Sequence, residues 1–214
     1  MKKYVVAFLM LGAVVCSLIL TACSSTSQLE KVEAREGKVV LDGLKKGGWE
    51  MNDISRSLEL AVLRHIEKLK DPANQSVTAT ATCRIMSNCD LAARTEVARK
   101  YGQQAALFLR ERIVGDNNFD QSNPDSEFAK LYSGYEGLVQ KEINGEIILS
   151  YDVVRKAQNN TKEYKAFYII NEEKASKARL RAMEQAFKET TAAQKYASQI
   201  ADFVKQGFKL KMDE

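Results

Sequence analysis

Hydrophobic and polar residues alternate with two different periods along this chain, and the period distinguishes helices from strands. Over residues 54–69, apolar side chains recur every three or four positions, with Asn52 or Asp53 as the N-terminal cap and Asp71-Pro72 as the stop. From Val77 to Cys83, small apolar residues alternate with threonine. The first pattern predicts an amphipathic helix, and the second predicts a strand with one buried face.

Two further helical patterns occupy the middle of the chain. The first begins near residue 88, ends before Gly115 and is rich in alanine, which lets a helix lie close to a sheet. The second opens at Pro124, and Gly134 and Gly137 lower the helix propensity of its later half. Both segments are predicted to be helices.

The last third of the chain has the pattern of a hairpin followed by a long helix. Residues 147–154 and 164–170 alternate as strands do, and the turn-forming residues 158–161 separate them. Residues 172–208 contain no proline, and no glycine before Gly207, and they follow one helical face. At 1.5 Å per residue, such a helix is roughly 50 Å long.

This order of elements predicts an α+β fold. We expect a small antiparallel sheet of three to four strands, helices packed on one face of it, and a long C-terminal helix. Residues 51–214 are predicted to form this single domain. Residues 23–50 are predicted to be a tether, with at most a short strand at residues 39–42.

The amino terminus has the organisation of a bacterial lipoprotein signal peptide, which we place at residues 1–22. Two basic residues, Lys2 and Lys3, precede an apolar run that closes with the small-residue motif Leu20-Thr21-Ala22-Cys23. The alternative is a transmembrane anchor, but the run is at the short end of what spans a bilayer, and polar residues follow it at once. Cleavage before Cys23 is therefore expected.

The Cys23 thiol accepts a diacylglycerol thioether, so the processed chain begins with an acylated cysteine. Several acyl chains, such as palmitate, together hold a protein on a membrane without a spanning helix. Ser24 stands where an aspartate would favour retention in the inner membrane of enteric bacteria. We therefore expect a lipid-anchored protein of the bacterial cell envelope, on the outer membrane.

Charge and cysteine content restrict the possible partners. The precursor has 32 basic and 28 acidic side chains, and removal of Lys2 and Lys3 lowers the net charge from +4 to about +2. This charge gives no indication of a nucleic-acid partner. Two cysteines, Cys83 and Cys89, remain beside Cys23 in the processed chain, and an even pair in an oxidising compartment predicts a disulfide.

Catalytic and metal-binding motifs are sparse. The single histidine, His65, supplies with Cys83 and Cys89 at most three zinc-type ligands, so neither a metal nor another cofactor is expected. GxSxG, HExxH and phosphate-binding glycine loops do not occur. Asp152 and Glu163 face each other across the predicted hairpin, but acids at strand ends are usually solvated or paired with lysine.

Two surfaces of the predicted C-terminal helix are candidates for contact. One is a basic stripe with a seven-residue repeat, formed by Lys174, Arg181, Lys188 and Lys195. Such a stripe is usually only a solvated face, and its functional alternative is contact with anionic headgroups or cell-wall polymer. The other is apolar, over residues 200–208, where a helix longer than the sheet is wide needs cover from residues 54–69 or from a second copy.

Two stretches carry a family resemblance. They are the segment NCDLAARTEVARKYGQQAALFLRERI at residues 88–113 and EYKAFYIINEE at residues 163–173, together with the spacing of Phe203 and Phe208. Over residues 76–214 the chain resembles the bacterial lipoprotein family named for the twenty-kilodalton membrane-associated lipoprotein antigen of Helicobacter. The resemblance implies an outer-membrane or surface lipoprotein of undefined biochemical role, and it supplies no catalytic residues.

These observations predict a non-enzymatic lipoprotein that acts as an interaction or structural module, with a second copy or another envelope protein as its partner. Two other classes remain open. A module that binds a small apolar or glycan ligand needs a deep pocket, for which Phe108, Tyr151 and Phe167 are the candidate lining. A cell-wall enzyme needs a cleft of converging acids with perturbed protonation.

Overall fold

The computed structural model describes residues 35–116, 124–190 and 194–210. The chain divides into two units, residues 1–47 and 48–214, and Cys23 lies outside the described residues. In the first unit, residues 35–46 form a helix, so the predicted strand at residues 39–42 is wrong. Val39, Val40 and Leu41 are consecutive apolar residues without strand alternation, and the lysines and leucines around them favour a helix.

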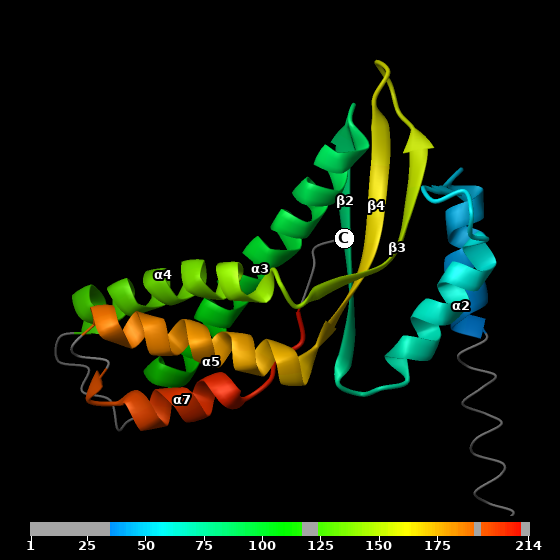
Figure 1. Ribbon diagram of the computed structural model, residues 1–214. Helices are drawn as coiled ribbons and strands as arrows, with labels where there is room; N and C mark the ends of the chain where they lie inside the picture. Colours follow the sequence, from blue (N-terminus) through cyan, green and yellow to red (C-terminus); the bar gives the residue numbers. More distant parts are fainter. Residues whose placement is uncertain (1–34, 117–123, 191–193, 211–214) are drawn as a thin grey trace, which may run out of the picture. The chain divides into compact units, whose positions relative to one another are not determined.

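The second unit contains a four-stranded antiparallel sheet (Figure 1). The strand order is β1-β3-β4-β2, with β1 at Glu50–Met51, β3 at Ile147–Lys156, β4 at Lys162–Asn171 and β2 at Asn74–Cys83. The β3–β4 hairpin turns through Asn159 and Asn160, whose φ angles are 57° and 56°. Asparagine tolerates this left-handed backbone, as the sequence predicted. The predicted α+β class is therefore confirmed.

A helical layer covers one face of this sheet and extends beyond it (Figure 1). Helix α3 packs directly on β2 and β4, α4 packs on α3, and α5 and α7 complete the layer. Their bounds are Met86–Val114 for α3, Pro124–Ile143 for α4, Glu172–Glu189 for α5 and Ala197–Lys205 for α7. One continuous apolar core joins this layer to the sheet face that carries Tyr164, Ala166 and Tyr168.

Helix α2 (Leu58–Leu69) lies on the opposite face of the sheet. Successive strand residues point to opposite faces, so Phe167 points away from the face of Tyr168. The ring of Phe167 meets His65 of α2 with centroids 6.1 Å apart, whereas Tyr168 belongs to the core under α3. Helices therefore pack on both faces of the sheet. The sequence predicted helices on one face, which describes the layer of α3, α4, α5 and α7, but it placed no helix on the face that α2 covers.

Helix α2 also begins later than the pattern predicted. Its N-cap is Ser57, whose side chain accepts a hydrogen bond from the Leu60 amide, rather than Asn52 or Asp53. Asp53 instead accepts bonds from the backbone and side chain of Ser55 in a local turn. Ile54 is 97% exposed and takes no part in the apolar stripe.

The predicted long C-terminal helix is interrupted: within the described residues it includes the separate helices α5 and α7. Helix α5 ends at Glu189, and Thr190 caps it with φ −136° and a hydroxyl that donates to the Ala186 carbonyl. Helix α7 then packs on α5 and α3, which buries Ile200 completely. The apolar residues near the end of the chain are covered by α3 and α5, not by residues 54–69.

Candidate functional site

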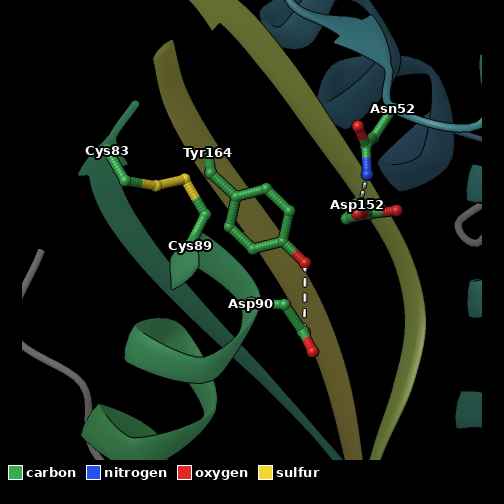
Figure 2. Close-up of a disulfide and its surroundings, with 6 residues drawn as sticks. All are labelled: Asn52, Cys83, Cys89, Asp90, Asp152 and Tyr164. Atoms are coloured by element: carbon green, nitrogen blue, oxygen red, sulfur yellow. Dashed lines mark hydrogen bonds between the residues drawn. A yellow bond between two sulfur atoms is a disulfide. The ribbon is translucent and has the colours of Figure 1, made fainter. Parts of the chain in front are cut away.

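A disulfide ties the end of β2 to the first turns of α3. Cys83 and Cys89 are bonded, as the sequence predicted, with their Cα atoms 5.7 Å apart, a normal separation for a disulfide. Figure 2 shows this bond beside Tyr164 and Asp90. Because Cys89 precedes Asp90, the disulfide holds the Asp90 carboxylate over the sheet.

Asp90 is the centre of a half-buried polar cluster on the face under α3. Its Oδ1 accepts hydrogen bonds from the hydroxyls of Tyr164, at 3.2 Å, and Tyr168, at 3.3 Å. Burial and then the neighbouring carboxylates raise the pKa of both tyrosines well above its usual range, so both hydroxyls stay protonated donors. Arg94 lies over the Tyr168 ring and donates to the Ile147 carbonyl at 3.0 Å. The cluster thus joins α3 to the sheet.

The two acids that face each other in the predicted hairpin lie on opposite faces of the sheet. Asp152 accepts a hydrogen bond from Asn52 at 2.8 Å, on the Tyr164 side (Figure 2). Glu163 points to the other face, where it forms an ion pair with Arg155, its partner in the strand register. These two carboxylates therefore form no dyad.

Arg179 forms the most buried polar site among the described residues, and sequence reasoning missed it. It lies on the inner stripe of α5 at 1% exposure. Its guanidinium donates to Glu172 at 2.6 Å, to the Tyr101 hydroxyl, and to the Val204 carbonyl at 3.1 Å. Burial lowers the pKa of Arg179, but Tyr101 and Glu172 outweigh this effect, and the pKa is raised. The guanidinium thus stays charged, with the Glu172 carboxylate as its counter-ion.

The same site fixes the C-terminal segment. The Phe208 ring stacks on Phe108 and lies under the Arg179 guanidinium, whose Cζ is 5.5 Å from its centroid. Gln75 of β2 donates to the Phe208 carbonyl at 3.1 Å and accepts from the Leu210 amide at 3.2 Å. These contacts pack residues 208–210 against α3, α5 and β2, and they indicate a structural role for the site.

His65 forms a hydrogen bond with Ser76 on the opposite face of the sheet. The ring Nε2 lies 2.8 Å from the Ser76 hydroxyl, and Tyr151 and Phe167 meet the ring edge-on. Burial, and then Lys68, lower the pKa of His65 to about 4. His65 is therefore a weak base, and its Nδ1 has no described hydrogen-bond partner. A histidine that activates a serine is normally oriented by an acid on this second nitrogen, and His65 has no such described partner. The histidine therefore packs α2 on the sheet.

The candidate ligand pocket is not formed from the predicted residues. Tyr151 and Phe167 stack with ring centroids 4.2 Å apart under α2. Phe108 lies on the other side of the sheet, in the helical layer, against Phe208. The structure has instead a groove of about 460 Å³ between α3 and α4, with the exposed Leu107 and Val114 among its walls and with Arg110 and Glu136 as its charged lining.

The predicted basic stripe is divided by the break after α5. Lys174, Arg181 and Lys188 lie on α5 and are exposed, whereas Lys195 lies beyond the helix end with its ammonium 5.3 Å from the Tyr196 ring centre. Arg181 forms ion pairs with Glu142 at 2.7 Å and Glu146 at 3.4 Å on α4 and the turn after it. Acidic neighbours therefore offset the stripe at its centre.

Comparison of the chain with protein-family models, with curated proteins and with solved structures gives no match. The family resemblance described above therefore rests on the quoted residues alone. Among the described residues, no helix is both long enough and apolar enough to cross a membrane.

Proposed function

We propose that this protein is a lipoprotein of the bacterial cell envelope, anchored by acyl chains on Cys23, whose folded part is a non-enzymatic interaction module. The observation that carries the proposal is the motif Leu20-Thr21-Ala22-Cys23 after a basic start and an apolar run. Membership of the Helicobacter lipoprotein family that residues 76–214 resemble is part of the same proposal.

Two features of the fold support the proposal. The Cys83–Cys89 disulfide suits an oxidising compartment such as the envelope. Two polar groups of the core also have structural partners: Asp90 joins α3 to β4, and Arg179 joins α5 to the C-terminal segment. Side chains held in this way build a rigid body, which suits a module that acts through its surface.

Metabolic labelling with a fatty-acid analogue tests the anchor. We expect the wild-type chain and Cys16→Ala to incorporate label, because Cys16 leaves with the signal peptide, and we expect Cys23→Ala to lose it. Cys16→Ala is a matched control, since it removes the other cysteine of the apolar run. If Cys23→Ala still carries label and partitions with membranes, the proposal is wrong.

Fractionation of the two membranes tests the location. In an enteric host the wild-type chain is expected in the outer membrane, whereas Ser24→Asp is expected to remain in the inner membrane. Equal distribution of the two proteins would contradict the outer-membrane placement and leave the acylation result standing.

A further inference from the structure

Strand β2 forms one edge of the sheet, and no strand within the described residues pairs with its outer side. The amide of Glu172 donates to the carbonyl of Ala73 at 2.7 Å, and the register between β2 and β4 continues from there without a shift. In an antiparallel pair, every second residue bonds to the neighbouring strand. The odd-numbered residues of β2 therefore bond to β4.

The even-numbered residues Ser76, Thr78, Thr80 and Thr82 consequently direct their backbone N–H and C=O groups toward the free edge. The strand itself lacks three features by which proteins block strand addition: charged side chains, proline and a bulge. Residues 74–82 contain no charged side chain and no proline, and the β2–β4 register shows no bulge. The edge is thus a template for another strand.

We propose that β2 pairs antiparallel with β2 of a second copy of this chain, so that two sheets join across a two-fold axis. The backbone pattern favours this occupant. Only even-numbered residues offer outward groups, so every antiparallel register places the hydroxyl residues opposite polar residues on one face of the joined sheets. On the other face, the register centred on Thr78 places Val77 opposite Ala79 of the second copy. In the register centred on Thr78, Thr80 faces Ser76 of the second copy and Thr82 faces Asn74.

The charges at the two ends of β2 also fit a second copy. Asp71 precedes the strand and Arg84 follows it, and both side chains are exposed. Antiparallel pairing places Arg84 of one copy beside Asp71 of the other. The neighbouring Lys70 lies 3.7 Å from Glu67 of α2, in an ion pair that offsets its charge. Each end of the joined strands would therefore carry opposite charges.

This inference goes beyond the proposed function and does not depend on the anchor. The lipid chains would only raise the local concentration of the two edges. A chain that is not acylated is still expected to dimerise, so failure of one proposal is distinguishable from failure of the other.

Sedimentation of the full-length chain in detergent, with single substitutions at Thr80, tests the pairing. Thr80→Pro removes an outward amide and leaves the β2–β4 hydrogen bonds intact, because Thr80 does not bond to β4. We expect dimers from the wild-type chain and from Thr80→Ala, which keeps the amide. We expect Thr80→Pro to weaken the dimer about tenfold or more.

Circular dichroism and an unreactive Cys83–Cys89 pair establish that each variant is folded. If Thr80→Pro does not fold, Thr80→Lys replaces it. The single chain tolerates a lysine at this exposed position, whereas two paired β2 strands do not. A monomeric wild-type chain, or a dimer that tolerates folded Thr80→Pro or Thr80→Lys, overturns the proposal.

A photoreactive phenylalanine analogue in place of Thr82 identifies the occupant of the edge in cells. We expect a crosslink to a second copy, near Asn74. A crosslink to another protein, to the same chain, or to a distant surface of the second copy shows that β2 has a different occupant and contradicts the pairing.

Discussion

At the scale of single residues, Arg179 shows how a charge becomes part of a core. Its neighbours on the inner stripe of α5 are Ala175, Ala178 and Ala182, all fully buried. Small side chains leave room for the long Arg179 side chain to reach Glu172 and the Val204 carbonyl. The carboxylate and the carbonyl replace the water that the guanidinium loses on folding.

We therefore predict that Arg179→Ala lowers the free energy of unfolding by about 3 kcal/mol, because it leaves Glu172 and the Val204 carbonyl without their donor. Arg181→Ala, two residues further along α5, removes exposed ion pairs to Glu142 and Glu146 and should cost less than about 1 kcal/mol. Urea unfolding of the two variants measures the difference. Equal losses would show that Arg179 contributes no more than a surface charge.

The sequence contained one sign of this site. Arg179 falls among the apolar positions of the α5 stripe, where a charge requires a buried partner. Its other partners could not be found from spacing, because Tyr101 and Val204 are 78 and 25 residues away along the chain. Only the packing of α7 against α3 and α5 brings them together. The Asp90 cluster was hidden in the same way, since Tyr164 lies 74 residues away.

At the scale of elements, the crossing of α3 and α4 depends on Gly102. A Cβ atom at this position would lie 2.8 Å from the carbonyl oxygen of Glu136 and 3.3 Å from Gln140 of α4. The contact is with helix backbone, which cannot move aside as a flexible side chain can. Gly102 therefore sets how closely the two helices approach.

Gly102→Ala is expected to lower the free energy of unfolding by about 2 kcal/mol, since the helices must separate. Gly137→Ala on α4 is the matched control, because its Cβ would meet nothing within 4 Å. There the gain in helix propensity should raise stability by about 0.5–1 kcal/mol. Thermal unfolding distinguishes the two cases, and a stabilising Gly102→Ala would contradict the close crossing.

Elements with a strong period were predictable, and those decided by distant contacts were not. The alternation at residues 77–83 located β2, and the helical spacing located α3 and α4. Strand β1 has only two residues, Glu50 and Met51, too few to show a period. No glycine or proline at Thr190 marks the end of α5 in the sequence. The helix ends there because a separate α7 can bury Ile200 and Val204 against α3 and α5.

At the scale of the whole molecule, the Cys83–Cys89 disulfide links the fold to its proposed compartment. The bond closes a loop with a sequence separation of 6 and joins the edge strand to α3. A loop of this size contributes about 2 kcal/mol by restricting the unfolded chain. The disulfide, and with it this stabilisation, forms only where the environment oxidises thiols. Stability should therefore depend on where the chain is delivered.

We predict that protein taken from the envelope has no free thiol at Cys83 or Cys89, whereas a chain that lacks residues 2–22 and stays in the cytosol has both. Alkylation without reductant, followed by mass measurement, counts the thiols in each. The cytosolic form, like a Cys83→Ser and Cys89→Ser variant of the envelope form, should be less stable by about 2 kcal/mol. Two alkylated thiols on envelope protein would contradict the bond, and an oxidised pair in the cytosolic form would separate the disulfide from the compartment.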